Sequence, residues 1–287
     1  MSSENIPCVD GPGTRGEIRT WSEDPLTARV RSIWSGADFL PIARSFAPGA
    51  EEFITRLALS AGESVLDVAC GTGNLAIPAA RAGARVTGLD IAPNLIAQAR
   101  LEARTAGLPI AFDVGDAESL PYGEGQFDTT VTMFGAMFAP RPARAAAELL
   151  RVTRPGGRIA MANWTPSGFV GHLLRAHTAV VPPPAGVPSP LLWGDEETVR
   201  ARFGDRVASL SCTRRTLELR FSFPPAAVTE LFATCYGPTA ATLRATDPDG
   251  ASRLRGELTR LFQEHNLASD GTTAVAGEYL DVQARVA

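Results

Sequence analysis

The chain has 287 residues, of which 45% are hydrophobic and 20% are charged, and its formal net charge is -4. This composition is typical of a globular protein with one large domain or two small ones, and it argues against a disordered or fibrous chain. All 27 basic residues are arginine, so chemistry that needs a lysine nucleophile, a Schiff-base lysine or a phosphate-loop lysine is excluded.

The cysteines and the net charge indicate which cellular compartment and which classes of partner to expect. Cys8, Cys70, Cys212 and Cys235 form no C-x-x-C pair, so no zinc, redox or iron–sulfur motif is predicted and no metal is expected. Few scattered thiols, with a polar N-terminus, favour the reducing cytoplasm. The acidic balance argues against a nucleic-acid partner. No apolar run approaches the ~18 residues of a membrane helix, so no membrane partner is expected.

In chain order, the first segment is residues 1–20, which we expect to be a disordered leader because it is rich in Gly, Ser, Pro and charge. Apolar positions at helical spacing over residues 24–60 predict two or three helices. From about residue 62 to 165, strand, turn and helix patterns alternate, which predicts parallel strands joined by right-handed crossovers. The predicted strands are Ser64–Ala69, Arg85–Asp90, Ile110–Val114, Phe127–Met133 and Arg158–Trp164.

The C-terminal part of the chain has a less regular pattern. Prolines at 182, 183, 184 and 188 predict an irregular loop over residues 166–205. Strand patterns follow at Val207–Phe223 and Val275–Val286, and residues 225–266 between them predict two or three helices. We expect residues 21–287 to form a single domain with a core at 62–165 and a helical cap at about 225–266.

The strongest local signal is Val65–Asn74 (VLDVACGTGN), where a buried strand ends in a glycine-containing turn that opens a helix. Glycine permits positive φ and close approach of a ligand, and the helix N-terminus offers free N–H groups. The spacing Gly71-x-Gly73-x-x-Ala76 would also pass for a dinucleotide-binding fingerprint, and a turn without a ligand is a further possibility.

Two acidic residues bear on these alternatives. Asp67 interrupts an apolar strand, and a buried carboxylate needs a partner such as a ligand ammonium or N–H groups of the loop. Asp90 ends the second predicted strand, where an acid can accept hydrogen bonds from both hydroxyls of a ribose. A helix N-cap is the alternative role for Asp90.

Five segments in order, VLDVACGTG, GLDIAP, GDAESLP, QFDTTVTMFGAMF and LLRVTRPGGRIAMANW, resemble the class I S-adenosylmethionine-dependent methyltransferases. The likeness is strongest to the branch that includes ubiquinone- and menaquinone-biosynthesis enzymes, and it covers about residues 62–165. It implies an α/β Rossmann-like fold with a seven-stranded, mostly parallel sheet, an antiparallel last strand, N-terminal helices and a helical cap. Ala69 departs from the family pattern, which usually has glycine there.

The resemblance implies S-adenosylmethionine as cofactor, with S-adenosylhomocysteine as product, and it implies roles for individual residues. Asp67 and the backbone of Ala69 and Gly71 would hold the methionine part. Gly73 would allow close approach beneath the ribose, and Asp90 would accept the ribose hydroxyls.

Further implied contacts complete the cofactor site. Ile91 would pack on the adenine. Asp116 would accept a hydrogen bond from the adenine amino group, with the Ala117 N–H nearby. Met133 and Phe134 would line the methionine end.

A base for the acceptor is sought among the histidines. His172 and His177 follow the fifth predicted strand and are the catalytic candidates, with a solvent-facing or structural histidine as the alternative for each. Five residues apart on one helix, they would point about 140° away from each other, so at most one should enter a site. Trp34 and Phe39 are lid candidates, with core packing as the alternative.

The expected function is methyl transfer from S-adenosylmethionine to an O, N or C atom of a small molecule by in-line displacement. One alternative is an S-adenosylmethionine-binding protein without methyl transfer, such as a cyclase or a regulatory binder. A nicotinamide-dependent oxidoreductase is another. The sequence predicts neither the acceptor nor the oligomeric state.

Overall fold

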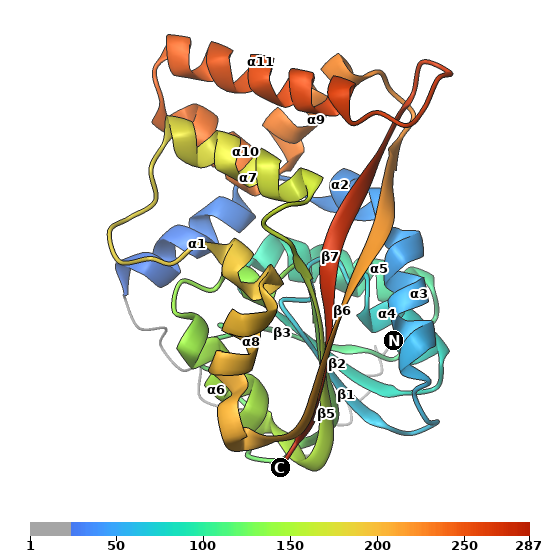
Figure 1. The fold of residues 1–287 in the computed structure, drawn as a ribbon. Coiled ribbons are helices and arrows are strands. Elements are labelled where there is room, and N and C mark those ends of the chain that lie inside the picture. The colour runs from blue at the N-terminus through green and yellow to red at the C-terminus, as the bar shows by residue number, and fades with distance from the viewer. Residues whose placement is uncertain (1–23) are drawn as a thin grey trace, which may run out of the picture.

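The computed structural model of the protein describes residues 24–287, and its centre is one seven-stranded sheet (Figure 1). The strands are β1 (Ser64–Val68), β2 (Arg85–Asp90), β3 (Ala111–Val114), β4 (Phe127–Met133), β5 (Thr153–Trp164), β6 (Val207–Phe221) and β7 (Thr273–Val286). Their order is β3-β2-β1-β4-β5-β7-β6. Strands β1 to β5 are parallel, and β7 is antiparallel to both of its neighbours. The predicted fold class is confirmed, whereas the predicted leader, residues 1–20, lies outside the described residues.

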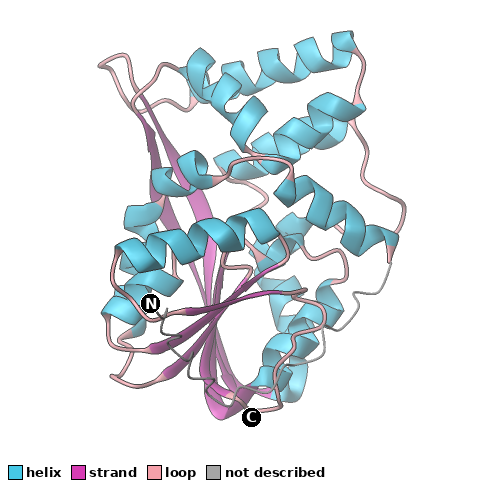
Figure 2. Cartoon of the chain, turned by 180° about the vertical axis from the view of Figure 1, so that it is seen from behind, coloured by secondary structure: helices cyan, strands magenta, loops and turns pink. Residues whose placement is uncertain are grey.

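Helices cover both faces of the sheet. The N-terminal helices are α1 (Pro25–Ser35), α2 (Leu40–Ser45) and α3 (Ala47–Leu57), and the next helices alternate with strands: α4 (Ala76–Arg81), α5 (Pro93–Thr105), η1 (Ala136–Phe138) and α6 (Pro142–Val152). Most of these helices have a proline in their first turn, where the missing N–H would have no helical partner. Helices α3, α4 and α5 lie on one side of the sheet, and α6 lies on the other (Figures 1 and 2).

The expectation of an irregular loop over residues 166–205 is wrong for most of that segment. It contains α7 (Phe169–Val180), η2 (Pro190–Gly194) and α8 (Glu196–Phe203), followed by η3 (Gly204–Arg206). The prolines that suggested a loop are confined to the stretch after α7 has ended. Helix α7 forms because its apolar side chains face the core, where Leu173 is 1% exposed.

The last two strands extend beyond the parallel part of the sheet (Figure 1). Strands β6 and β7 pair from Val207↔Val286 to Phe221↔Thr273. The segment between them forms three helices, α9 (Pro225–Cys235), α10 (Gly237–Ala245) and α11 (Pro248–Glu264). These helices and α7 stand over the end of the sheet at which β1 and β4 finish (Figures 1 and 2).

Within residues 24–287, none of the helices combines the length and the apolar character that crossing a bilayer would require.

Candidate functional site

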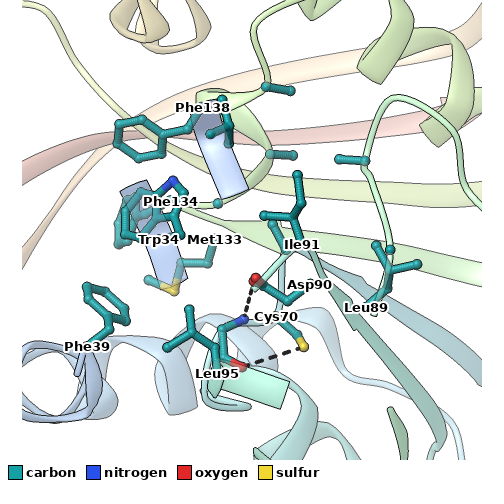
Figure 3. A pocket seen from close by; sticks show the side chains of 18 of the residues that line it. Trp34, Phe39, Cys70, Leu89, Asp90, Ile91, Leu95, Met133, Phe134 and Phe138 are labelled. Carbon is teal, nitrogen blue, oxygen red and sulfur yellow. Dashed lines mark hydrogen bonds between the residues drawn. The ribbon is translucent and has the colours of Figure 1, made fainter. Parts of the chain in front are cut away.

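A cavity lies at the carboxyl ends of the parallel strands, where the loops after β1, β2, β3 and β4 meet helix α1 (Figure 3). One side carries Asp90 and Ile91, and the other carries the aromatic side chains of Trp34, Phe39 and Phe138. Open parallel sheets bind ligands at this edge because the strand order reverses there. We call this space the cofactor cavity.

Asp90 is the charged centre of the cofactor cavity. It ends β2 and is 6% exposed, and its two carboxylate oxygens accept hydrogen bonds from the Gly71 N–H (2.8 Å) and the Ala92 N–H (2.9 Å). Each oxygen retains further acceptor capacity, so two hydroxyls of a ligand can still be bound. Burial raises the pKa of Asp90 to about 6 because the charged form loses hydration.

The turn after β1 has the conformation that its sequence predicts. Gly71 has φ +54°, and a Cβ added there would meet nothing within 4 Å, so its open side faces the cavity. Ala69, where the family usually has glycine, also adopts a left-handed conformation with φ +57°. Its Cβ is accommodated because Gly135 faces it: a Cβ on Gly135 would lie 2.6 Å from that of Ala69.

Asp67 lies beneath the cofactor cavity and does not line it. Its carboxylate is 1% exposed and accepts a hydrogen bond from the Ala76 N–H (3.0 Å), in the first turn of α4. A backbone N–H of the loop–helix turn is therefore one partner of this buried acid. Burial, with a contribution from the nearby charge of Asp90, raises the pKa of Asp67 to about 8.

The loop after β3 closes the cavity against α1. Asp116 accepts hydrogen bonds from the Glu118 N–H (2.9 Å) and the Thr27 hydroxyl (3.3 Å). Arg141 pairs with Asp24 and, at 2.7 Å, with Glu118, so it joins the start of α1 to this loop. No local pattern around Arg141 indicates this role, because Asp24 is 117 positions away.

The end of the cavity beyond the turn after β1 is aromatic. Phe134 follows β4 in a left-handed conformation (φ +56°) and stacks on Trp164 with ring centroids 3.5 Å apart. Trp34 packs edge-on against Phe39 (5.6 Å) and Phe138 (5.2 Å). The lid candidates Trp34 and Phe39 therefore do line the cavity, as does Phe138, which the sequence analysis did not name.

Neither catalytic candidate lines the cofactor cavity. His172 lies between α7 and α11, with its ring centroid 5.8 Å from that of His265. His177 is buried, and its Nδ1 donates to the Leu173 carbonyl (2.7 Å) because a carbonyl can only accept. Its Nε2 therefore accepts from the Thr239 hydroxyl (2.7 Å), and burial lowers its pKa to about 4. His177 also lines a neighbouring cavity that shares Trp34 and Phe138 with the cofactor cavity. The catalytic role of these two histidines stays a prediction.

The cavity residues fit a cofactor that carries a ribose and an adenine. Eight of the ten predicted cofactor residues line the cavity, namely Ala69, Gly71, Asp90, Ile91, Asp116, Ala117, Met133 and Phe134, whereas Asp67 and Gly73 lie behind it. The hydroxyl of Thr72, which is 3% exposed and also lines the cavity, has no hydrogen-bond partner among the described residues. A buried hydroxyl without a partner is costly, so a polar ligand atom would stabilise it.

Known proteins resemble the chain in sequence and in fold. A family model described as a methyltransferase domain matches residues 65–157. An uncharacterized protein of Mycobacterium tuberculosis is 39% identical over 260 residues, which cover 89% of this chain and 93% of that protein. Methyltransferase GfsG of Streptomyces halstedii is 38% identical over 139 residues, covering 47% of this chain and 50% of that protein.

Solved structures share the fold. The YcgJ protein of Bacillus subtilis matches with a TM-score of 0.57 and 18% identity, covering 83% of this chain and 98% of that one. Three observations point to the same family: the sheet order with its antiparallel β7, the turns that carry carboxylates, and these sequence matches. The chain therefore belongs to the class I S-adenosylmethionine-dependent methyltransferase family, a family of enzymes that use S-adenosylmethionine as their cofactor.

Proposed function

We propose that this protein transfers a methyl group to an oxygen, nitrogen or carbon atom of a small molecule. The observation that carries this proposal is the shape of the cofactor cavity: its far end meets the partly buried Trp34 and the buried side chains of Phe134 and Trp164. A nucleic acid would need an open basic surface at this point. An enclosed apolar wall favours a small acceptor instead.

Each part of the chain has a role in this proposal. Asp90 would hold the ribose, Ile91 would pack on the adenine, and Asp116 with Ala117 would bind the adenine edge. Asp67 would support the turn after β1 from beneath the cavity, through its hydrogen bond from the Ala76 N–H. When bound, S-adenosylmethionine supplies a methyl carbon on a positively charged sulfur. The aromatic wall would exclude water and restrict the orientation of a bound acceptor.

The proton balance of the reaction places a condition on the acceptor. The acceptor would supply the electron pair of the new bond to the methyl carbon, and the sulfur of the cofactor would keep the pair of the bond that breaks. A proton on the acceptor atom would leave with the product and pass to solvent outside the aromatic wall. His177 offers no free nitrogen for this proton, because both ring nitrogens are hydrogen-bonded. We therefore propose an acceptor that reacts without a histidine base.

Calorimetric titration with S-adenosylhomocysteine and with NADH tests the cofactor, and mass spectrometry for S-adenosylhomocysteine formed with a panel of small acceptors tests the reaction. We expect micromolar binding of S-adenosylhomocysteine, no heat with NADH, and acceptor-dependent turnover. Tight cofactor binding without turnover on any acceptor would favour the binding-protein alternative.

A further inference from the structure

A second space adjoins the cofactor cavity at its Phe134 end, and we call it the aromatic chamber. Its lining comes from elements far apart in the chain: the N-terminal helices, the ends of β4 and β5, α7, β6, α9, α11 and β7. The chamber and the cofactor cavity share five residues, namely Trp34, Phe39, Phe46, Phe134 and Phe138. A molecule in the chamber would therefore reach the end of the cavity where the methyl group is expected.

The chamber is built to hold an uncharged group. Eleven of its sixteen lining residues are aromatic, and the others are aliphatic. Among the described residues that line it, none is an aspartate, glutamate, arginine or histidine. A charged acceptor would lose its hydration there without gaining a charged partner, which is costly.

The walls of the chamber present both faces and edges of rings. Trp34 meets Phe39 at an interplanar angle of 87° and Tyr236 at 81°, whereas Phe134 and Trp164 are parallel within 7°. Aromatic rings prefer edge-to-face or offset-stacked neighbours, and such pairs add to the stabilisation from apolar burial. A flat unsaturated ring therefore finds more favourable contacts here than a flexible aliphatic chain.

Among the described residues that line the chamber, Tyr236 alone has a hydroxyl. It is 6% exposed, and its ring packs against Trp34 (5.9 Å) and Phe232 (5.3 Å). Within the described part of the chain the hydroxyl makes no hydrogen bond, although its backbone N–H does bond to Phe232. Because Tyr236 lines the chamber, its hydroxyl can form a hydrogen bond with a polar group of a ligand held there.

We propose that the methyl acceptor is a neutral aromatic compound whose ring enters the aromatic chamber and whose hydroxyl or carbonyl group hydrogen-bonds Tyr236. This inference rests on the proposed function, because it assigns the acceptor class to the same site. Tyr236 is the residue that selects and positions the acceptor.

The test uses the full-length protein saturated with S-adenosylhomocysteine, and calorimetry with four probes. The probes are 1-naphthol, 1-methoxynaphthalene, 1-naphthoate and octan-1-ol, which differ in hydrogen-bond donor, charge and flatness. The variants are Tyr236→Phe, the chamber-filling Val170→Phe, and the matched control Tyr122→Phe. Tyr122 lies outside the chamber, and its hydroxyl bonds to Asp113 (2.9 Å). Cofactor affinity and the midpoint of thermal unfolding are measured on every variant first.

We expect 1-naphthol to bind at least tenfold more tightly than 1-naphthoate and octan-1-ol. The Tyr236→Phe variant should bind 1-naphthol on the order of fivefold more weakly, with 1-methoxynaphthalene much less affected, as the loss of one hydrogen bond predicts. Val170→Phe should abolish binding of both neutral naphthalenes, and Tyr122→Phe should change neither. If Tyr236→Phe does not fold, the Val170→Phe result and the order of affinities among the four probes still test the proposal.

Two results would overturn the proposal. One is binding of 1-naphthoate or octan-1-ol as tight as that of 1-naphthol, and the other is unchanged 1-naphthol binding in both Tyr236→Phe and Val170→Phe. Failure of S-adenosylhomocysteine to bind the unaltered protein would instead refute the proposed function. The two failures are therefore distinguishable.

Discussion

The two ends of the site are built in different ways. The polar end, around Asp90 and the turn at Gly71, consists of backbone groups and carboxylates at the ends of neighbouring strands. The aromatic end consists of side chains such as Trp34, Trp164 and Tyr236, which meet only after α1, β5 and α10 have packed together. Backbone groups at the polar end suit a single ligand, the cofactor. Side chains at the aromatic end can be substituted one at a time, which would alter the acceptor that binds there. Measurements of binding and of stability can show which of the two ends a substitution affects.

Replacing Asp90 with Asn should have the largest effect on the polar end. The variant loses charged hydrogen bonds to a ligand, each worth about 1.5–3 kcal/mol, so the affinity for S-adenosylhomocysteine should fall roughly 10- to 100-fold. Calorimetry measures this change, and Asp113→Asn on the exposed side of β3 is the matched control. Unaltered cofactor affinity in Asp90→Asn would contradict the assignment.

Replacing Gly135 with Ala should disturb the junction between the two ends. The new Cβ would lie 2.5 Å from the Ala69 carbonyl oxygen, and a backbone atom cannot move aside easily. We expect a loss of about 1–3 kcal/mol in the free energy of unfolding, measured by urea titration.

The matched control for that substitution is Gly256→Ala in helix α11. A Cβ there meets nothing within 4 Å, and alanine favours the helix by about 0.5–1 kcal/mol. Equal unfolding midpoints for the two variants would show that the contact between Gly135 and Ala69 is not tight.

A change of pH should affect the polar end alone. Burial raises the pKa of Asp90 to about 6, so its carboxyl is protonated below that pH and charged above it. Because the charged form accepts the ribose hydroxyls, cofactor affinity should fall as pH decreases through 6, by roughly tenfold between pH 7 and pH 5. Binding of 1-naphthol should stay constant over this range.

The Asp90→Asn variant is the control for the pH dependence. It should bind S-adenosylhomocysteine weakly but equally at pH 5 and pH 7, because residue 90 then has no proton to exchange. A steep pH dependence in this variant would assign the effect to another group.

Replacing Asp24 with Asn should have the smallest effect, because it weakens only the closure of α1 over the cavity. Asn still caps the helix, so the substitution removes little except the ion pair with Arg141. Stopped-flow displacement should show S-adenosylhomocysteine dissociating on the order of threefold faster, as expected for a partly exposed pair.

Salt concentration checks the origin of that change. The difference between Asp24→Asn and the unaltered protein should disappear in concentrated salt, which screens the pair. Asp38→Asn is the control, since Asp38 accepts a hydrogen bond from the Leu40 N–H at the start of α2 and has no ion pair within residues 24–287. A rate difference that persists at high salt would indicate that altered capping of α1, and not the lost ion pair, causes the faster dissociation.

The positions of Asp90 and Gly71 at one edge of the sheet could be predicted from the sequence because their determinants are local. Asp90 and Gly71 lie at the ends of strands whose apolar runs can be read directly, and parallel strands bring those ends to one edge. The contact of Tyr236 with Trp34 depends on how α10 packs against α1, which no local pattern encodes. The surroundings of His172 and His177 could not be predicted for a related reason, because a position after β5 does not decide which neighbour a helix face contacts.

The way in which residues 222–272 join the sheet has a practical consequence. Phe221 and Thr273, the last paired residues of β6 and β7, hold the two ends of this segment side by side. A replacement whose ends are equally close can be grafted between them without lengthening either strand. Because the cofactor cavity draws none of its lining from this stretch, such grafts offer a route to new acceptor specificities on an unchanged cofactor-binding base.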